Sequence, residues 1–382
     1  MSAFDFTHNQ SIKDFVKKEK YVPQQLGSKI ILDEEPEEST LVILGVEDGR
    51  NSKGNEGSAE APNKIRKELY KLFSYSNDLL IYDIGNIEQG KTVMDTVAAV
   101  RTTCNDLYRK NCTVIILGGA HWISYGQFEG YDKLEQQVNF LNIDSRLDLE
   151  DEEELGSQSH IFKTLCHPNG ILFNFCHLGY QTYLTNPEHL NVLDKLQFDA
   201  LRLGEAQEQL HKVEPLIRDA DMIAFDISAI RYSDAPANFY ASPHGFYGEE
   251  ACQLFRYAGM NEKLSSIGIY ELEPTIATSN QCMSLAAQLA WHFIDGYLNR
   301  QKDDPMYGKE NFVRFRTIFD KTNEEIVFYK SKKTDRWWMQ VPTPNQPKNA
   351  LYQLIPCNYE DYLQAANEEV PDKWLKLFNK LS

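Results

Sequence analysis

The segment Asp144-Ser-Arg-Leu-Asp148 places two carboxylates at the end of a short apolar run that begins at Val138. Aspartates at the end of a buried strand often bind a divalent metal ion in α/β proteins. Arg146 lies between the two aspartates, where a ligand for a cation would be expected rather than a fixed positive charge. The segment therefore predicts an altered metal site, in which the role of Arg146 has to be explained.

Three further predicted strands end in side chains of the same kind. His121 comes after the strand predicted at 112–119, Asp226 after the strand at 222–225, and Glu271 after the strand at 266–270. In open parallel sheets, ligands gather outside the carboxyl ends of the strands, so these groups could meet the two aspartates at one rim. A single aspartate at a strand end is more often a turn or cap residue. One histidine with three carboxylates, however, suits a divalent ion such as manganese.

A β/α alternation between residues 40 and 300 supplies the elements that position these groups. Apolar runs predict strands at 40–46, 78–85, 112–119, 137–144, 170–179, 222–230 and 264–274. Apolar residues at helical spacing predict helices at 61–73, 92–110, 188–196, 204–213, 247–258 and 279–299. Strands separated by helices favour a three-layer α/β fold, in which a central parallel sheet has helices on both faces.

Both ends of the chain differ from this alternation. Residues 1–39 are polar and become acidic toward their end, which predicts an N-terminal arm before the α/β domain at 40–300. Residues 305–382 predict a small C-terminal extension. In it, the alternation at 323–342 indicates a hairpin, and the pattern at 371–381 indicates an amphipathic helix.

Three tryptophans, Trp337, Trp338 and Trp374, stand out in the C-terminal extension. Large aromatic side chains bury much apolar area, so we expect them to anchor the extension to itself or to the main domain. A surface that binds a protein partner is the alternative use.

The overall composition argues against several kinds of partner. The chain has 382 residues and a net charge of −17 at pH 7. Nucleic acid or an anionic membrane surface would favour a basic face, so we expect neither. The first residues lack the apolar core of a signal peptide, and no apolar run reaches the roughly 18 residues of a membrane-spanning helix. The seven cysteines form no Cys-x-x-Cys pair, which is typical of reduced thiols in a cytoplasmic protein.

The ordered set of motifs resembles the arginase, agmatinase and formimidoylglutamase superfamily, the ureohydrolases. The matching segments are GGAHWISYG (118–126) for Gly-Gly-Asp-His-Ser, DSRLD (144–148) for Asp-Ala-His-x-Asp, AFDIS (224–228) for Ser-x-Asp-x-Asp, and YELEP (270–274) for Glu-x-Asn-Pro. The opening segment at 44–72 and YDIGN (82–86) are also similar to the family. The segment FNFCHLGYQTYL (173–184) is most similar to the formimidoylglutamase branch, and the C-terminal tail resembles a variant of that branch typical of Bacteroidetes. The resemblance implies an arginase-like fold.

The resemblance also implies a site for two manganese ions that hold a bridging hydroxide. All ligands of the first ion are present: His121, Asp144, Asp148 and Asp226. The second ion would share two of these aspartates, but its two private ligands are replaced by Arg146 and Ser228. The aspartate that supports the first histidine is replaced by Ala120, and such a loss costs about 10–100-fold in metal affinity or activity. We therefore expect one manganese ion or none, and no two-metal cluster.

Two positions are open for the Arg146 side chain. It could lie inward, where the second ion would be, and neutralise Asp144 and Asp226, since arginine stays protonated and binds carboxylates bidentately. It could also turn outward and form a weak ion pair with the acidic run at 150–154. We expect the inward position, because a buried pair of carboxylates without a cation is unfavourable.

Two functions follow from the resemblance. In the first, the chain is a formimidoylglutamase-like protein with a degraded dimanganese site. It would be an impaired hydrolase or a pseudoenzyme that binds a small guanidino or formimino ligand, or that assembles with a protein through residues 305–382. In the second, it is an active hydrolase of a formimino or guanidino C–N bond. Glu271 would then accept hydrogen bonds from substrate nitrogens, and His177 or His160 would transfer protons. The loss of both private ligands of one ion favours the first function.

Overall fold

The structure is a computed structural model of the chain. It describes residues 3–76, 79–134, 136–306, 308–319, 325–343 and 352–382. Parts of three predicted segments lie outside the described residues: residues 1–2 of the arm, residue 78 of the second strand, and residues 307, 320–324 and 344–351 of the C-terminal extension, which include residues 323–324 of its hairpin. None of the helices in the described parts combines the length and the apolar character that crossing a membrane requires.

A large sheet forms the centre of the main domain. Its strands are β1 (Thr7–His8), β2 (Ile30–Ile31), β3 (Leu41–Glu47), β4 (Ile81–Glu88), β5 (Thr113–Leu117), β6 (Val138–Ile143), β7 (Leu172–Tyr180), β8 (Asp199–Arg202), β9 (Met222–Asp226) and β10 (Ser266–Tyr270). Their order is β1-β4-β3-β5-β10-β9-β6-β7-β8, and β2 also pairs with β4. Among these described strands, only β1 runs antiparallel to its neighbour. The predicted central, mostly parallel sheet is confirmed.

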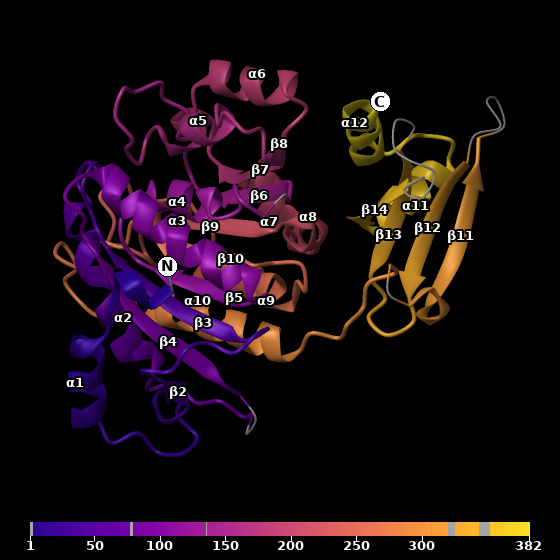
Figure 1. Cartoon of the computed structure of the whole chain (residues 1–382). Coiled ribbons are helices and arrows are strands. Elements are labelled where there is room, and N and C mark those ends of the chain that lie inside the picture. Colours follow the sequence, from indigo (N-terminus) through magenta and orange to yellow (C-terminus); the bar gives the residue numbers. More distant parts are fainter. Residues whose placement is uncertain (1–2, 77–78, 135, 307, 320–324, 344–351) are drawn as a thin grey trace.

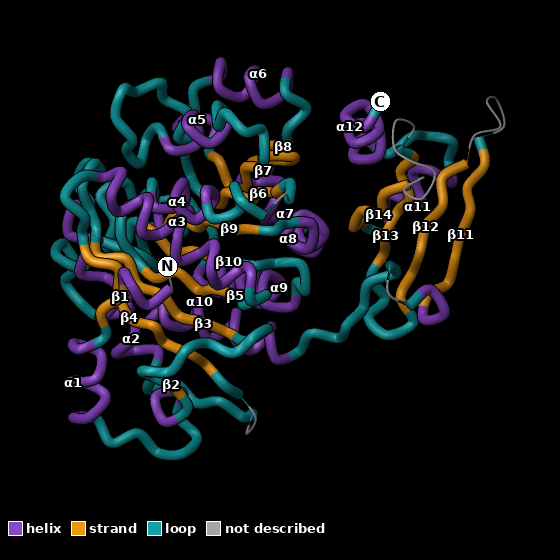
Figure 2. The backbone as a smooth tube through the Cα atoms, viewed as in Figure 1, coloured by secondary structure: helices purple, strands orange, loops and turns teal. Residues whose placement is uncertain are grey.

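Helices cover both faces of this sheet (Figures 1 and 2). They are α1 (Gln10–Lys18), α2 (Ala61–Leu69), α3 (Val93–Arg109), α4 (Ile123–Glu129), α5 (His160–Leu165), α6 (Pro187–Lys195), α7 (Leu203–Glu208), α8 (Glu214–Asp219), α9 (Gly248–Met260) and α10 (Gln281–Leu298). Buried side chains of α2, α9 and α10 pack on one face, and those of α3, α4 and α5 pack on the other. The three-layer α/β fold is therefore confirmed.

Strand β3 shows why the strands read as continuous apolar runs. Leu41 and Ile43 belong to the core under α2 and α10, whereas Val42 and Leu44 belong to the core under α3. All four side chains have no exposed surface. A strand that is covered on both faces needs apolar residues at every position instead of alternate ones. Full burial of each such side chain contributes about 1.5–3 kcal/mol.

The N-terminal residues differ from the arm that we expected. Strand β1 pairs with β4 in an antiparallel direction, and β2 pairs with β4 in parallel. Ile12 on α1 and Leu26 are fully buried in the same core as α2. The polar composition concealed this docking, because a few apolar residues among many charged ones are enough to fix a short segment on a sheet edge.

Sequence patterns missed the shortest elements of the main domain. Strand β8 has four residues, and α5 and α8 have six each. Elements of this length contain at most two periods of the hydrophobic pattern, so the pattern gives little signal. The strand predicted at 222–230 ends at Asp226, where a short 3₁₀ helix (Ile227–Ala229) begins.

The C-terminal extension is a second, smaller layer structure. Its elements are the strands β11 (Phe312–Ile318), β12 (Glu325–Ser331), β13 (Trp337–Pro342) and β14 (Tyr352–Cys357) and the helices α11 (Tyr359–Ala366) and α12 (Asp372–Leu381). The strands form an antiparallel sheet in chain order. The predicted hairpin is its inner pair, β12 and β13, and the predicted amphipathic helix is α12. The sequence analysis missed β11, β14 and α11.

The three tryptophans anchor this extension, as expected. Trp337 lies in the small core between the sheet and the helices, with an exposed fraction of 7%. Trp338 is 4% exposed and packs against Phe312 on the other face of the sheet. Trp374 on α12 stacks on Phe378 and donates its indole N–H to the backbone of Gln340. Most of their aromatic area is thus used inside the extension.

Arg218 on α8 attaches the extension to the main domain. Its guanidinium donates to the backbone oxygens of Trp337 and Cys357 and lies over the ring of Trp338, with Cζ 4.3 Å from the ring centroid. Glu214 pairs with Arg218 at 3.0 Å. A largely buried arginine with an acidic partner, two carbonyl acceptors and an aromatic face is a strong local contact.

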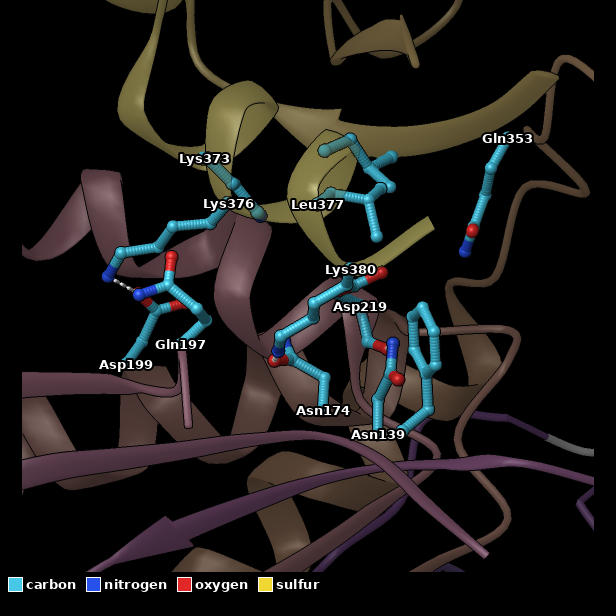
Figure 3. A pocket seen from close by; sticks show the side chains of 12 residues that line it. Asn139, Asn174, Gln197, Asp199, Asp219, Gln353, Lys373, Lys376, Leu377 and Lys380 are labelled. Atoms are coloured by element: carbon cyan, nitrogen blue, oxygen red, sulfur yellow. Dashed lines mark hydrogen bonds and ion pairs between the residues drawn. The ribbon is translucent and has the colours of Figure 1, made fainter. Parts of the chain in front are cut away.

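Helix α12 contacts the main domain at the amino ends of the strands (Figure 3). Lys376 pairs with Asp199 at the start of β8, at 2.6 Å, and Lys380 donates to Asn174 near the start of β7, also at 2.6 Å. Asn139, near the start of β6, lines the same small cavity. The predicted rim of ligands lies at the opposite, carboxyl ends of these strands. The extension is therefore attached on the side of the sheet away from that rim.

A buried ion pair joins two of the motifs that carry the family resemblance. Arg66, from the segment at 44–72, donates from Nε and Nη2 to the two carboxylate oxygens of Asp83 in YDIGN, at 2.6 and 3.0 Å. The guanidinium also donates to Asn86 and to the backbone of Gly85, and the hydroxyl of Tyr70 donates to Asp83. Arg66 has no exposed surface. The pair fixes α2 against β4, beside the loop that leads to the rim.

We predict that Arg66→Met destabilises the chain by about 3–5 kcal/mol, because it leaves the Asp83 carboxylate buried without a cation. The apparent free energy of unfolding in urea measures this effect. Lys64→Met is the matched control on the same helix, since it removes only an exposed pair with Glu60 and is expected to cost less than about 1 kcal/mol. The double variant Arg66→Met with Asp83→Leu should recover part of the loss. A loss below about 1 kcal/mol for Arg66→Met would contradict this role of the pair.

Candidate metal centre

Four neighbouring strands bring the predicted site residues together. In the sheet, β5, β10, β9 and β6 lie side by side in that order, so their carboxyl ends share one edge. The residues at or just beyond these ends are His121, Glu271, Asp226, Asp144 and Asp148. The structure thus places them at one rim, because the strands that carry them are neighbours in space although they are distant in the sequence.

A two-glycine turn directs the end of β5 into the rim. Gly118 and Gly119 both have left-handed backbone angles, with φ of +73° and +79°. A side chain at Gly119 would place its Cβ 2.2 Å from Cδ1 of Ile123. Glycine adopts this conformation without strain and without such a clash. The turn is the local reason why His121 leaves the strand toward the aspartates.

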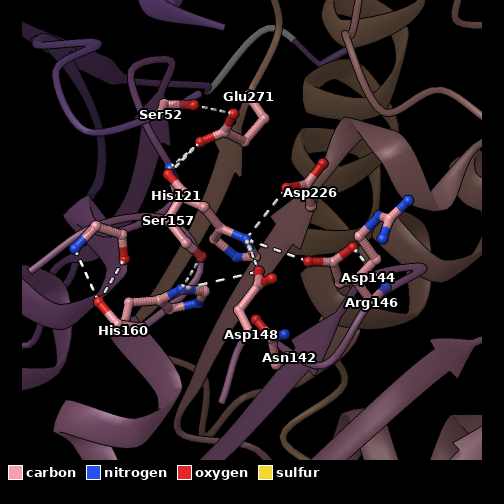
Figure 4. Close-up of polar contacts among 12 residues, drawn as sticks. Ser52, His121, Asn142, Asp144, Arg146, Asp148, Ser157, His160, Asp226 and Glu271 are labelled. Atoms are coloured by element: carbon pink, nitrogen blue, oxygen red, sulfur yellow. Dashed lines mark hydrogen bonds and ion pairs between the residues drawn. The ribbon is translucent and has the colours of Figure 1, made fainter. Parts of the chain in front are cut away.

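Three carboxylates surround one ring nitrogen of His121 (Figure 4). Its Nδ1 lies 3.2 Å from Oδ2 of Asp226, 3.4 Å from Oδ2 of Asp144 and 3.7 Å from Oδ2 of Asp148. Ligand atoms that share one divalent ion, with bonds of about 2.1 Å, lie about 3.0–3.4 Å from one another. Two of the distances have this spacing and the third is slightly longer. His121, Asp144 and Asp226 are therefore arranged like ligands of one ion, and His121 also belongs to a second group of possible ligands with Asp148 and His160.

The chemistry of this donor set also fits one divalent ion. One imidazole with three carboxylates suits manganese and similar ions. His121 is fully buried, and neither of its ring nitrogens forms a hydrogen bond with a described residue. A buried polar ring of this kind is unfavourable unless another group satisfies it. The residues present thus fit one ion, held by His121 and by the Oδ2 atoms of Asp144 and Asp226, while Asp148 lies with His160 on another side of His121.

The other oxygens of two of these aspartates are occupied by donors from the chain itself. Ser228 donates its hydroxyl to Oδ1 of Asp144 at 2.9 Å and its backbone N–H to Oδ1 of Asp226 at 2.7 Å. The backbone N–H of Arg146 also donates to Oδ1 of Asp144, at 3.0 Å. Each carboxylate thus faces His121 with one oxygen and a hydrogen-bond donor with the other. A second ion that shared these two aspartates would have to compete with these hydrogen bonds.

Arg146 takes neither of the two positions that we predicted. Among the described residues, its guanidinium forms no ion pair with Asp144, with Asp226 or with the acidic run at 150–154. It lies over the ring of Tyr240, with Cζ 5.0 Å from the ring centroid, and Figure 4 shows it turned away from His121. The expected guanidinium bridge between the aspartates is therefore wrong. Tyr240 is distant in sequence, so no local pattern could indicate this position.

The electrostatics of the cluster follow from burial and from crowded carboxylates. Burial lowers the pKa of His121, but the three carboxylates outweigh burial and hold this pKa well above its usual value. Burial and the charge of Asp144 raise the pKa of Asp226 to about 7 and that of Asp148 well above its usual value. Burial also opposes ionisation of Asp144, but the adjacent, positively charged His121 ring holds the pKa of Asp144 below the usual range. The cluster therefore favours positive charge next to Asp144.

Glu271 lies beside the cluster, and its carboxylate is fully used by the chain. Oε1 accepts from the backbone N–H of His121 at 2.7 Å and from the hydroxyl of Ser157 at 2.5 Å. Oε2 accepts from the amide of Asn55 at 2.7 Å and from the hydroxyl of Ser52. An ionised carboxylate has about four acceptor positions, so these donors saturate it. The geometry favours a positioning role for Glu271 over the contact with substrate nitrogens that we expected.

The backbone of Glu271 is held in an unusual conformation by the same network. Its φ of +61° lies in the left-handed region, which is unfavourable for a residue other than glycine and is found mainly where surrounding contacts enforce it. The amide of Asn238 donates to the backbone oxygen of Glu271 at 2.9 Å. Asn55 in turn accepts from the backbone N–H of Phe239 at 2.7 Å. Two loops thus donate to the carboxylate that also holds His121, and a third is tied to the backbone of Glu271 and to Asn55.

Sequence reasoning missed most members of this network. Ser52, Ser157 and Asn238 are small polar residues in loops, and such residues are common in any turn. The Asn-x-Gly element at 55–57 was the available signal, since it belongs to the segment that resembles the arginase superfamily. Its Gly57 donates a backbone N–H to Glu273 at 2.5 Å.

Ala120, where the resemblance implies an aspartate, cannot support a ring nitrogen. Its backbone N–H donates to the backbone oxygen of Asp48 at 2.9 Å, and its side chain is only a buried methyl group. The carboxylate of Asp48 is bound by Arg50 and Thr96, at 2.6 and 2.8 Å. His121 is therefore positioned through its backbone, by Glu271.

The two candidate proton carriers lie below the rim. The ring of His160 is fully buried, with its centroid 4.2 Å from that of His121, and its Nδ1 is bonded to the backbone oxygen of Ser157 at 2.8 Å. His177 on β7 is bonded through Nδ1 to Asn142 on β6, at 3.2 Å. Burial lowers the pKa of His177 to about 4 and that of His160 well below its usual value. Only His160 is in ring contact with a candidate ligand, so it is the better placed of the two.

Comparisons with known proteins agree with this fold. Residues 39–295 match the sequence profile described as the Arginase family. The formimidoylglutamase of Staphylococcus haemolyticus is 28% identical over 273 residues, which cover 66% of this chain and 83% of that protein. A crystal structure of a Trypanosoma cruzi formiminoglutamase variant with Mn²⁺ has a TM-score of 0.67 at 19% identity and covers 72% of this chain and 99% of that one. The formimidoylglutamase of Bacillus subtilis has a TM-score of 0.66 at 19% identity, over 72% of this chain and 92% of that one.

We predict that Glu271→Gln weakens Mn²⁺ binding by about 10–100-fold, because the amide cannot accept all four hydrogen bonds and His121 loses its backbone anchor. Isothermal titration calorimetry measures the affinity, and circular dichroism verifies that the variant is folded. Glu273→Gln is the matched control: this buried glutamate lies on the same loop, but it binds Thr275 and Gly57 and not His121. Equal effects of the two substitutions on Mn²⁺ binding would contradict the positioning role of Glu271.

Proposed function

The chain belongs to the arginase family, and from that membership we propose that it is a formimidoylglutamase-like protein that binds one divalent ion. We propose further that this protein hydrolyses amidine C–N bonds weakly or not at all. Its ureohydrolase fold and the four aligned ligands favour retention of an ion. The function that it would keep is the binding of a small formimino or guanidino compound at the rim. Manganese is the proposed ion, because the Trypanosoma cruzi relative contains it and the donor set suits it.

One observation carries this proposal. The hydroxyl of Ser228 occupies Oδ1 of Asp144, the oxygen that faces away from His121, where the resemblance implies a metal-binding carboxylate at position 228. Arg146, at the position of the other private ligand, carries a charge that cannot coordinate a cation and lies over Tyr240 instead. Both substitutions therefore act on the same half of the site. The half around His121 keeps its ligands.

The consequence for catalysis follows from the role of paired ions. A bound divalent ion supplies Lewis acidity and lowers the pKa of a water ligand, and a pair of ions does so more strongly and fixes the direction of attack. His121, Asp144 and Asp226 would hold the single ion in this chain. No residue of the described rim replaces the second positive charge between Asp144 and Asp226, since the Arg146 guanidinium pairs with neither. We therefore expect poor stabilisation of an attacking hydroxide.

A second candidate function is an active hydrolase of the formimidoylglutamase type that works with one ion. The position of His160 favours it, because its ring lies against that of His121 and could take a proton from a substrate or water at the rim. Under this alternative, measurable turnover would depend on the imidazole of His160. The proposed impaired function predicts that turnover is near the detection limit with or without His160.

Restoring the two lost ligands tests the proposal. We expect the double variant Arg146→His with Ser228→Asp, loaded with Mn²⁺, to hydrolyse N-formimino-L-glutamate about 10³-fold faster than wild type, because the contribution of a metal to catalysis is several kcal/mol. Ammonia release measures turnover. Arg146→His with Ser228→Ala is the matched control, since it removes the same wild-type groups and restores only one ligand. Wild-type turnover of about 1 s⁻¹ or more, a rate ordinary for enzymes, would contradict the impaired function.

A further inference from the structure

Arg146 is an unsatisfied cation beside the candidate metal centre. Its side chain is half-buried, and its Nε has no accessible surface and no hydrogen-bond partner. Within the described parts of the chain, the guanidinium forms no ion pair and no hydrogen bond, and the aromatic ring beneath it is that of Tyr240. A protein with a net charge of −17 has abundant acidic side chains that could have paired with it. The missing anion is therefore a property of this position.

Two other arginines that lie over aromatic rings in this chain have acidic partners, whereas Arg300, over Tyr297, donates only to Gly259 and Thr113 among the described residues. Arg231 lies over Tyr247, 3.9 Å from the ring centroid, and pairs with Asp234 at 3.0 Å. Arg218 lies over Trp338 and pairs with Glu214. In both cases the ring supports the flat side of the guanidinium and a carboxylate binds its edge. Arg146 has the ring and lacks the carboxylate.

The support under Arg146 is rigid. The backbone N–H of Tyr240 donates to Asn238 at 2.6 Å, and Asn238 is bonded to the backbone of Glu271. The neighbouring Phe239 is 58% exposed and is tied to Asn55 through its backbone. The loop that carries the ring is thus fixed by the backbone oxygen of Glu271 and by Asn55, which also donates to the Glu271 carboxylate. A guanidinium held on such a loop is pre-organised, so a ligand would not have to order it.

The chemistry of the missing partner is that of a carboxylate. A guanidinium presents parallel N–H donors that match the two oxygens of a planar carboxylate. A monoanion is favoured over a dianion such as phosphate, because the aspartates of the rim repel each added negative charge. Those aspartates, or the ion that they hold, suit an amidine or another nitrogen-rich group at the opposite end of the ligand. The site therefore fits a small molecule with opposite charges at its two ends.

We propose that Arg146 binds the carboxylate of a small amidino acid whose amidine end lies at the His121 and aspartate cluster. This assignment rests on the proposed function for the position of the amidine end. It makes Arg146 a determinant of specificity. Arg146 stands where a metal-binding side chain was expected, and it selects small molecules by the charge of the end opposite their amidine. An amidine of the same length with a cationic far end binds more weakly.

Two probes test this selection: 4-guanidinobutanoate and agmatine share the guanidine end and differ at the other, which is a carboxylate in the first and an ammonium in the second. We expect the Mn²⁺-loaded wild type to bind 4-guanidinobutanoate about 10–100-fold more tightly than agmatine in calorimetric titrations, as for a charge-assisted pair. Arg146→Gln should abolish the preference, and Arg146→Lys should keep part of it through its point charge. Arg231→Gln removes another arginine that lies over an aromatic ring, and it should leave the preference for 4-guanidinobutanoate unchanged.

The same titrations without added metal separate this inference from the proposed function. A preference that depends on Arg146 in a protein that binds no ion would support the carboxylate site and refute the proposed metal centre. One bound ion per chain, with equal affinity for both probes or with a preference that survives Arg146→Gln, would overturn the carboxylate site. Circular dichroism and thermal unfolding of the Arg146 variants verify that they retain the fold.

Discussion

The rest of the site depends on how the two buried aspartates at the ends of β6 and β9 are neutralised. Asp144 and Asp226 each direct one oxygen toward His121 and the other toward hydrogen-bond donors of the chain, chiefly Ser228. Burying two carboxylates this close together is unfavourable unless cations or strong donors face both sides. One side has the geometry of a metal site, and the other is satisfied by the protein. This asymmetry decides how many ions fit, and it leaves Arg146 free for another partner.

The support for His121 comes from elsewhere in the fold. The Glu271 carboxylate gathers donors from the loops after β3 and before α5 and holds the backbone of the histidine, while the Arg66 and Asp83 pair fixes the helix that follows the first of these loops. The C-terminal extension is attached at the opposite ends of the strands, through Arg218 and α12. The ligand rim and the extension thus lie at opposite ends of the strands of one sheet. Changes in either need not disturb the other.

Much of this could be predicted from the sequence, because burial on both faces of a parallel sheet leaves continuous apolar runs and because ligands collect at the strand ends. The fold class and the convergence of His121, Asp144, Asp148 and Asp226 follow from those two rules. The position of Arg146 could not be predicted, since Tyr240 reaches it from a distant loop. The saturated carboxylate of Glu271 was equally invisible, because its donors are ordinary loop serines and asparagines. Short elements such as β8, and the docking of α1, gave too few residues for a periodic signal.

The number of ions that the chain binds tests the central claim most directly. Elemental analysis of the purified chain, after loading with excess Mn²⁺ and removal of unbound metal, gives this number without any assumption about substrate. The account predicts about one ion per chain, lost when His121 is replaced by alanine and retained when Ser228 is replaced by alanine, since the serine lies on the side that holds no ion. Two ions per wild-type chain would contradict it, because both halves of the site would then coordinate metal despite Arg146 and Ser228.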